Sequence, residues 1–223
     1  MDEIRTVKLK ESIIKNNDAD ADKLRGELDD MGVFYINVMS SPGSGKTTLL
    51  CALTKALKDK CRIGVMEADI DGDVDAYTVR QAGVESIQLH TGGMCHLDAD
   101  MSRQGFKEFK TGADIVFLEN IGNLVCPAEF DTGAHLNLVL LSVPEGDDKP
   151  LKYSLMFSSG DAVAITKLDT AKYFDFDVDK CKQYVAKLNP NTTFFTVSAR
   201  SGEGVERLAD WIYSKYAEWK VKK

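Results

Sequence analysis

The segment that most constrains the fold of this chain is Ser40–Thr48, with the sequence SSPGSGKTT. It follows the apolar run Val33–Met39, which is typical of a buried strand, and it precedes Leu49–Leu53, which is typical of the start of a helix. Small residues between a strand and a helix let successive backbone N–H groups point into one cavity, and the helix N-terminus adds a partial positive charge. The segment therefore predicts a phosphate-binding P-loop rather than a turn without a ligand.

The pattern G-x-x-x-x-G-K-[ST] assigns roles within this loop. Lys46 is expected to reach the β- and γ-phosphates, which makes it a candidate catalytic residue, and the Thr47 hydroxyl is expected to ligate Mg²⁺. The first position is Ser40 instead of Gly, and a small residue still fits there. The predicted phosphate-binding residues are Gly43, Ser44, Gly45, Lys46, Thr47 and Thr48.

The composition is that of a globular protein and argues against some partners. The 223 residues are 43% hydrophobic and 28% charged, and no apolar run approaches the roughly 20 residues of a membrane span. The net charge of −7 argues against non-specific nucleic-acid binding. The charged start and the odd count of five cysteines favour neither a secretory leader nor a disulfide framework, so we expect a cytoplasmic location.

Apolar runs alternate with helix-like stretches along the chain. Continuous apolar strands imply a sheet covered on both faces, and the alternation predicts an α/β fold with a doubly wound, mostly parallel sheet. The predicted strands are Val33–Met39, Arg62–Glu67, Ser86–His90, Ile115–Glu119, Leu136–Val143, Ala162–Thr166 and Thr193–Val197. The predicted helices are Thr47–Leu57, Ala76–Ala82, Ala99–Lys110, Val178–Leu188 and Val205–Tyr216.

The first 30 residues differ from the rest because they are charged and contain no strand-like run. They predict one or two helices broken near Asn16-Asn17. We expect an N-terminal helical extension over residues 1–30 and a P-loop domain over residues 31–223. Apolar residues of the extension are expected to pack on that domain or on a second subunit, and they are Ile4, Val7, Ile13, Ile14 and Leu24.

Two later motifs predict that the bound base is guanine. Asp169, in the sequence Thr166-Lys167-Leu168-Asp169 after a strand, can accept hydrogen bonds from the N1–H and 2-amino groups of guanine, which adenine does not offer as a pair. Lys167 is expected to cover the base with its stem and to hold the P-loop with its ammonium group. Ser198 and Ala199 follow the last strand, where a backbone N–H can contact the guanine O6 atom. Thr166 stands where GTPases commonly have Asn. The signal-recognition-particle GTPases are similar in using Thr there.

Acidic residues at strand ends are candidate ligands for Mg²⁺, which prefers oxygen. Glu119 ends one strand and takes the Walker B position, and Gly122 is placed to bind the γ-phosphate through its N–H. Asp69 and Asp75 belong to an acidic run that also holds Asp71 and Asp73. We predict that Asp69 and Asp75 position the γ-phosphate and the attacking water, and that Asp69 also contacts the metal.

A second, softer metal site is predicted from two loops. Cys95 and His96 follow one strand and Cys126 follows another, and loops after parallel strands gather at the same edge of a sheet. Thiolates and imidazole select ions such as Ni²⁺ and Zn²⁺. Three ligands leave a tetrahedral site incomplete, and a two-fold dimer can complete it. The alternative is two unrelated loop cysteines and a surface histidine. The remaining cysteines read as ordinary buried or half-buried thiols, and they are Cys51, Cys61 and Cys181.

Together these motifs resemble the HypB family, the nickel-incorporation GTPases of [NiFe]-hydrogenase maturation. The resemblance is carried by the P-loop and by the specific stretches Cys95–Ala99, Glu119–Ala128 and Glu145–Tyr153. It implies a homodimer that binds GTP and Mg²⁺ and hydrolyses GTP slowly. It further implies that Ni²⁺ (or Zn²⁺) binds Cys95, His96 and Cys126 near the dimer interface. The implied partners are a small nickel-binding accessory protein and the hydrogenase large-subunit precursor.

The chain departs from the family pattern in places, and other functions fit parts of it. Residues 1–30 contain no Cys or His, so the additional N-terminal nickel motif of some members is missing. The usual Gly-Lys-Gly-Cys-His sequence is Gly92-Gly93-Met94-Cys95-His96 here, so a lysine common in the family is also missing. The alternatives are a related GTPase serving urease or a cobalamin enzyme, a P-loop kinase acting on a small molecule, and a metal-storage protein with a vestigial nucleotide site.

Overall fold

The computed structural model describes residues 2–69, 83–91, 93–109 and 112–223, with side chains from residue 16 onward except that of residue 69. Seven strands form one sheet in the order β3-β2-β4-β1-β5-β6-β7, and every pairing is parallel. This confirms the predicted α/β, doubly wound sheet. The strands are β1 (Phe34–Met39), β2 (Ile63–Asp69), β3 (Glu85–His90), β4 (Ile115–Glu119), β5 (Leu136–Ser142), β6 (Ala162–Thr166) and β7 (Thr193–Thr196).

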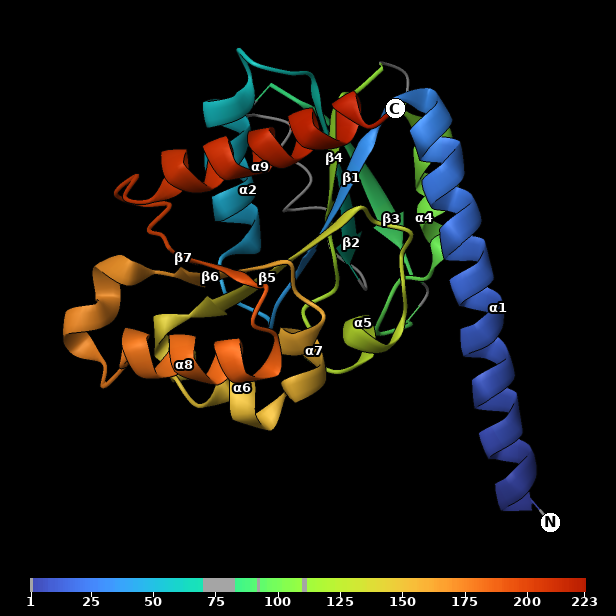
Figure 1. Cartoon of the computed structure of the whole chain (residues 1–223), viewed down its shortest axis with the longest axis horizontal. Helices are drawn as coiled ribbons and strands as arrows, with labels where there is room; N and C mark the ends of the chain where they lie inside the picture. Colours follow the sequence, from blue (N-terminus) through green and yellow to red (C-terminus); the bar gives the residue numbers. More distant parts are fainter. Residues whose placement is uncertain (1, 70–82, 92, 110–111) are drawn as a thin grey trace.

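Helices cover both faces of this sheet (Figure 1). On one face α2 (Lys46–Leu57) and α9 (Val205–Val221) pack against each other and against alternate residues of the central strands. On the other face α1 (Asp2–Met31) and α4 (Ala99–Glu108) cover one half of the sheet, and α8 (Val178–Leu188) covers the other half. The inner strands β1, β4 and β6 are buried along their whole length, which explains why their sequences are mostly apolar, whereas the edge strands β3 and β7 are mostly half-buried.

The predicted break near Asn16-Asn17 is wrong, because α1 runs without interruption from Asp2 to Met31. Asn weakens helices when its side chain competes for nearby backbone groups. Here the Asn17 amide bonds to Ala99 and Asp131 instead, so tertiary contacts remove that competition. Leu24, expected to pack on the domain or on a second subunit, packs on the domain with Ala21 and Leu28 in the core beside α4.

Several short elements were not predicted from the sequence. The stretch after β5 forms a 3-10 turn, η1 (Val143–Glu145), so β5 ends one residue earlier than expected. The Ser142 and Glu145 side chains cap this turn reciprocally. The other unpredicted elements are α5 (Cys126–Glu129), α6 (Lys149–Lys152), α7 (Ser154–Ser158) and the 3-10 segment η2 (Leu168–Tyr173). The predicted helix Ala76–Ala82 lies outside the described residues.

The three cysteines expected to be ordinary thiols lie in packed positions. Cys51 and Cys61 are half-buried and Cys181 is buried. Burial raises the pKa of Cys61 to about 11 and that of Cys181 to about 12. The thiols of Cys61 and Cys181 therefore stay protonated at neutral pH, as thiols with a packing role do.

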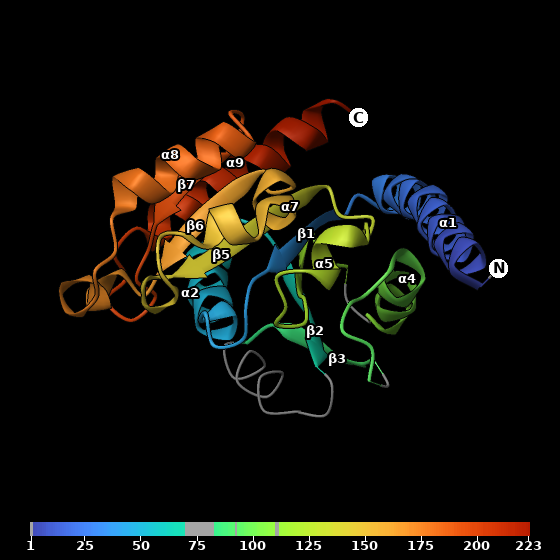
Figure 2. The same ribbon diagram turned by 90° about the horizontal axis from the view of Figure 1, so that it is seen from below.

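The chain connections place the polar motifs at one edge of the sheet. Seen from below in Figure 2, the loops after β1, β4 and β6 lie near one another although they are distant in sequence. This is the edge at which the parallel strands end, where open α/β sheets bind ligands. Among the described residues, no helix is both long enough and apolar enough to cross a membrane.

Candidate functional site

The P-loop is built around a buried serine. The Ser40 side chain is fully buried, and its Oγ accepts hydrogen bonds from Ser44 Oγ (2.5 Å) and from Lys46 Nζ (3.1 Å). Gly43 and Gly45 have φ angles of 71° and 94°, a region that other residues rarely adopt. Ser40 therefore uses its hydroxyl to hold the loop and its lysine, which explains why Ser stands at the first position of the motif.

Candidate Mg²⁺ ligands meet at the start of α2. Thr47 Oγ1 donates to Glu119 Oε1 at 2.9 Å, so the loop hydroxyl and the strand-end carboxylate already lie together. A cavity of about 170 Å³ next to them is lined by Lys46, Glu67, Glu119, Gly122 and three other residues. A hydroxyl and a carboxylate beside a lysine are donors that suit Mg²⁺ bound to phosphate oxygens.

The structure describes little of Asp69 and Asp75, the two residues predicted to position the γ-phosphate and the attacking water. Asp69 is the last residue of β2, opposite His90 of β3, and its side chain is not described. Asp75 lies outside the described residues. The sequence reading did not single out Glu67, which is buried and lies opposite Glu119 in the β2–β4 register. Its position two residues before Asp69 was the available signal.

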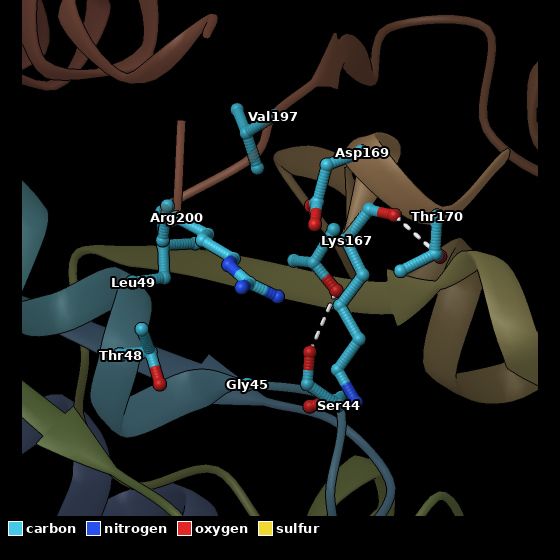
Figure 3. A pocket seen from close by; sticks show the side chains of 11 residues that line it. Ser44, Gly45, Thr48, Leu49, Lys167, Asp169, Thr170, Val197 and Arg200 are labelled. Atoms are coloured by element: carbon cyan, nitrogen blue, oxygen red, sulfur yellow. Dashed lines mark hydrogen bonds between the residues drawn. The ribbon is translucent and has the colours of Figure 1, made fainter. Parts of the chain in front are cut away.

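A second cavity, of about 250 Å³, lies beside the P-loop and contains the predicted base-binding residues (Figure 3). Lys167 and Asp169 lie on one side of it, and Thr48, Leu49 and Arg200 lie on the other. The cavity therefore lies beside the P-loop, where a base attached to P-loop-bound phosphates is expected.

Lys167 and Thr166 tie the base loop to the P-loop. Lys167 Nζ donates to the Gly43 carbonyl at 2.6 Å, as expected from the sequence, and Thr166 Oγ1 donates to the Ser44 carbonyl at 2.6 Å. Lys167 has a φ of 55°, the one positive value outside glycine among the described residues. Such backbone strain is tolerated where the surrounding contacts fix it, commonly at functional sites. The Thr166 hydroxyl thus has a structural role, which is to hold the backbone of the P-loop at Ser44.

The two guanine motifs form one wall of this cavity. Ser198 Oγ donates to Asp169 Oδ1 at 2.7 Å, and Ala199 and Arg200 line the cavity beside them. Ser198 is fully buried, so its hydroxyl fixes the orientation of the Asp169 carboxylate. Asp169 lines the cavity, and its second carboxylate oxygen is the predicted acceptor for a bound base.

Glu145 contacts the P-loop, and the sequence analysis gave it no individual role. One carboxylate oxygen contacts the Ser41 hydroxyl of the P-loop, and the other accepts from Ser142 N (2.8 Å) and Ser142 Oγ (2.6 Å). Glu145 therefore fastens the P-loop to the end of β5. The specific stretch that begins at Glu145 was the signal that could have found it.

The structure brings the two predicted metal-binding thiols together. Cys95 Sγ lies 3.0 Å from Cys126 Sγ, although 31 positions separate them in the sequence. The bond to Cys126 and partial desolvation raise the pKa of Cys95. Cys126 is the first residue of α5, and Cys95 lies in the loop after β3. Both sulfurs are free of disulfide bonds.

His96 lies beside this pair without completing a ligand set. Its Nδ1 is 3.9 Å from Cys95 Sγ, and its ring stacks on Phe130 with centroids 3.8 Å apart. Burial lowers the pKa of His96, which favours the neutral imidazole that ligates metals. Within the part of the chain that the structure describes, no three His, Cys, Asp or Glu side chains are grouped to hold a metal ion.

The loop that leads to Cys126 packs against the P-loop. Asn123 N donates to the Ser40 carbonyl at 2.9 Å. A Cβ on Gly122 would lie 2.9 Å from Pro42 Cα, so only glycine fits this approach. Asn120, at the start of the loop, donates to Asn37 of β1 at 3.0 Å. The γ-phosphate side of the P-loop and Cys126 are therefore joined by one short, packed segment.

The fold and the site define a nucleotide-binding P-loop protein of the CobW/HypB/UreG class. The family profile described as "CobW/HypB/UreG, nucleotide-binding domain" matches residues 34–196, which include the P-loop, the paired thiols and the Thr166–Asp169 motif. The structure of the signal recognition particle receptor FtsY from Elizabethkingia anophelis is also similar, with a TM-score of 0.56 at 16% identity over 84% of this chain and 70% of that one, which shows a shared fold alone.

Within this class the chain belongs to the hydrogenase maturation factor HypB family. It is 42% identical over 219 residues to the "Hydrogenase/urease maturation factor HypB" of Helicobacter hepaticus, covering 96% of this chain and 90% of that one. It is 42% identical over 213 residues to the HypB of Rhizobium leguminosarum bv. viciae, covering 95% of this chain and 71% of that one.

Solved structures agree with this family. The structure of HypB from Helicobacter pylori in complex with nickel is 40% identical, with a TM-score of 0.87, and the match covers 91% of this chain and 96% of that one. HypB from Archaeoglobus fulgidus is 33% identical, with a TM-score of 0.84, covering 91% and 99%. The first of these proteins is thus a nickel-bound relative whose fold extends over nearly the whole of this chain.

Proposed function

We propose that this protein is a GTP-hydrolysing nickel metallochaperone that assists nickel insertion into a [NiFe]-hydrogenase. The observation that carries the proposal is the packing of the Cys126 loop on the P-loop through Gly122 and Asn123. A change at the γ-phosphate moves a segment that ends at a metal-binding thiol. The nickel-bound relative and the hydrogenase maturation role of the family support the metal and the recipient.

In the nucleotide site, GTP is held by the P-loop and the base cavity. The phosphates are bound by Gly43, Ser44, Gly45, Lys46, Thr47 and Thr48. Gly122 contacts the γ-phosphate. Guanine is bound or framed by Thr166, Lys167, Asp169, Ser198 and Ala199. Thr47 and Glu119, with Asp69, are the residues that would hold Mg²⁺, which neutralises phosphate charge when bound. Lys46 stabilises the developing charge, and Asp69 and Asp75 orient the attacking water. Because the described residues include no identified arginine finger or water-positioning glutamine, we expect slow turnover.

In the metal site, Cys95, His96 and Cys126 take up Ni²⁺ as cargo, and Zn²⁺ is the competing ion. One chain supplies too few ligands for a closed site, so two copies related by a two-fold axis are proposed to share it. GTP favours this homodimer, and hydrolysis relaxes it and releases the metal. The proposed partners are a small nickel-binding accessory protein and the hydrogenase large-subunit precursor, in the cytoplasm.

The deciding experiment is a Ni²⁺ titration with and without a non-hydrolysable GTP analogue, followed by sedimentation or light scattering for the dimer. We expect the analogue to change both nickel affinity and dimerisation, because coupling between two ligands is reciprocal. If nickel affinity and oligomeric state are the same with and without the analogue, the nucleotide site and the metal site are independent and the proposed coupling is wrong. A phosphorylated small-molecule product in place of free phosphate would favour the kinase alternative.

Urease is the second candidate recipient, because the Helicobacter relatives are called hydrogenase/urease maturation factors. Nickel transfer can be measured with each apo-enzyme precursor in parallel. Activation of the hydrogenase precursor alone supports the first assignment, and activation of urease alone overturns it. The metal-storage alternative predicts that Lys46→Ala still supports maturation in cells, whereas the proposed function predicts its loss.

A further inference from the structure

Asn17 of α1 is a polar side chain buried on the face that packs against the domain. It is only 8% exposed, and both ends of its amide are used. Nδ2 donates to the Asp131 carbonyl at 2.9 Å, and Oδ1 accepts from the Ala99 N–H at 3.0 Å. A buried amide with both ends bonded to backbone holds its partners at a fixed spacing, because losing either bond leaves a buried group unpaired.

The two partners of Asn17 belong to the two segments that carry the thiols. Ala99 is the first residue of α4 and follows Cys95 by four positions. Its N–H is one of the helix-start donors that have no partner within the helix. Asp131 follows Cys126 by five positions, directly after α5 and Phe130. One side chain from the N-terminal helix therefore bonds both segments.

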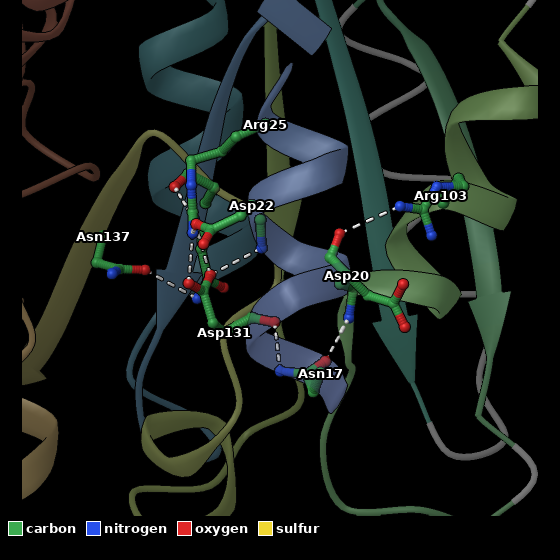
Figure 4. A network of polar contacts seen from close by, with 11 residues as sticks. Asn17, Asp20, Asp22, Arg25, Arg103, Asp131 and Asn137 are labelled. Atoms are coloured by element: carbon green, nitrogen blue, oxygen red, sulfur yellow. Dashed lines mark hydrogen bonds and ion pairs between the residues drawn. The ribbon is translucent and has the colours of Figure 1, made fainter. Parts of the chain in front are cut away.

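The rest of α1 holds this bridge in place (Figure 4). Arg25 makes a two-pronged ion pair with Asp131, at 3.0 and 2.8 Å, and Glu27 pairs with Arg103 of α4 at 2.9 Å. Ala21, Leu24 and Leu28 are buried on the same face as Asn17, as expected for positions three and four residues apart. The helix is thus anchored to the segments on both sides of the thiol pair.

We propose that Asn17 is a positioning residue of the metal site, which fixes the spacing between the Cys95–His96 segment and the Cys126 segment so that a soft divalent ion meets ligands already in place. This rests on the proposed metal site. Groups that hydrogen-bond directly to metal ligands are commonly worth about 10- to 100-fold in affinity, and Asn17 acts one step further out through the backbone of Ala99 and Asp131, so we expect the lower end of that range. Helix α1, which contains no Cys or His, thereby contributes to metal binding from outside the ligand set.

The test is metal binding by full-length Asn17→Ala, measured with Zn²⁺ in chelator competition and with Co²⁺ through the thiolate-to-cobalt absorption band. We expect about a tenfold or greater loss of Zn²⁺ affinity and an altered Co²⁺ spectrum, with GTP affinity within twofold of the parent. Asn17→Asp keeps the acceptor for the Ala99 N–H and loses the donor, so it should fall between Asn17→Ala and the parent. Parent-like Zn²⁺ affinity and Co²⁺ spectrum in Asn17→Ala would overturn the proposal.

Two controls separate positioning from general stability. Asp22→Ala removes an exposed ion-pair partner of Arg25 on the same helix and should leave metal affinity unchanged. Leu28→Ala removes buried packing of α1 and leaves both hydrogen bonds of the Asn17 side chain in place, so equal metal loss in it at the same fall in Tm would also overturn the proposal. The Cys95→Ala, Cys126→Ala double variant tests the site itself. If the double variant still binds metal with parental affinity, the proposed function is contradicted. If the double variant loses metal binding but Asn17→Ala binds metal like the parent, only the role of Asn17 is contradicted.

Discussion

The nucleotide site and the thiol site lie at the same edge of the sheet but are built differently. In the P-loop, Ser40, Ser44 and Lys46 are buried and bonded to one another, so the phosphate cradle is formed before any ligand arrives. At the thiol site Cys95 is exposed, Cys126 is half-buried, and His96 stacks on Phe130. A site of backbone N–H groups folds with the chain, whereas a site of side chains from separate loops depends on what holds those loops together.

The largest expected effect is loss of metal binding in the Cys95→Ala, Cys126→Ala variant. Each ligand of a structural zinc site contributes roughly 3 kcal/mol to the binding free energy, so removing two thiolates should weaken Zn²⁺ or Ni²⁺ binding about 10⁴-fold. GTP affinity should stay within twofold. Isothermal titration measures both, and a Cys51→Ala, Cys61→Ala variant is the matched control. Unchanged metal affinity would place the metal elsewhere.

Lys46→Ala is the reciprocal test on the nucleotide side. We expect GTP affinity to fall about 100-fold, because a charge-assisted hydrogen bond to phosphate is worth roughly 3 kcal/mol. Nucleotide-free metal affinity should not change. Fluorescent-nucleotide binding gives the first quantity and chelator competition the second. Lys58→Ala is the control, since Lys58 caps the far end of α2. A large metal effect without nucleotide would show that the two sites are not separable.

Asp169→Asn tests base recognition within the nucleotide site. The amide no longer accepts from both guanine N–H groups, so GTP affinity should fall about 30-fold, roughly 2 kcal/mol. Xanthosine triphosphate should gain affinity, because its 2-oxo group accepts from the new amide. Asp175→Asn, an exposed carboxylate nearby, serves as the control. Equal affinities for both nucleotides before and after the change would remove Asp169 from the base site.

Gly122→Ala acts on the segment that joins the two sites. Its Cβ would approach Pro42 Cα to 2.9 Å, so the loop or the P-loop must shift. Overpacking of this kind costs about 1 kcal/mol or more, which corresponds to a several-fold loss. We expect both GTP and metal affinities to fall, and the coupling between them to weaken most. Gly26→Ala, where a Cβ meets open space, is the matched control. Loss confined to one ligand would contradict a shared segment.

The smallest expected effect concerns pH and the anchoring of α1 far from both sites. Burial lowers the pKa of His135, whose Nδ1 accepts from Tyr35 N and whose Nε2 faces Asp29 of α1. Below pH 6.5 the unfolded state binds more protons than the folded state, so stability should fall from pH 6.5 down to the lowered folded pKa and be constant above it. Thermal unfolding from pH 8 to pH 5.5 measures this slope. His135→Asn should flatten it, and an equal slope in that variant would exclude His135 as its source.

Much of the nucleotide site was predictable because its motifs are local. The P-loop, the Thr166–Asp169 segment and Ser198-Ala199 each follow a strand, and strand ends of a parallel sheet meet. Lys167 was predicted to hold the P-loop and does so. Glu145 and Glu67 were missed because their positions beside the P-loop and beside Glu119 are set by long-range packing, and the signals near them in the sequence do not indicate these neighbours.

The helix break and the geometry of the thiol site show the limit of sequence reasoning. The same Asn17 that suggested a break is bonded to two distant backbone groups and stays helical. The position of Cys95, His96 and Cys126 in loops after parallel strands predicted that they meet, yet the structure brings only the two sulfurs together and stacks the histidine ring on Phe130. Long-range packing decided both outcomes.

The sequence by itself determined the parallel sheet, the P-loop and the residue types at the strand ends, because periodicity and turn chemistry act over a few neighbouring residues. Tertiary structure alone decided how far apart the thiols lie, that Glu145 and Thr166 also fasten the P-loop, and how α1 bonds the two thiol segments. These depend on contacts between residues far apart in the sequence, such as those of Asn17 with Ala99 and Asp131, which are 82 and 114 positions away. Such contacts form only once the whole hydrophobic core is packed.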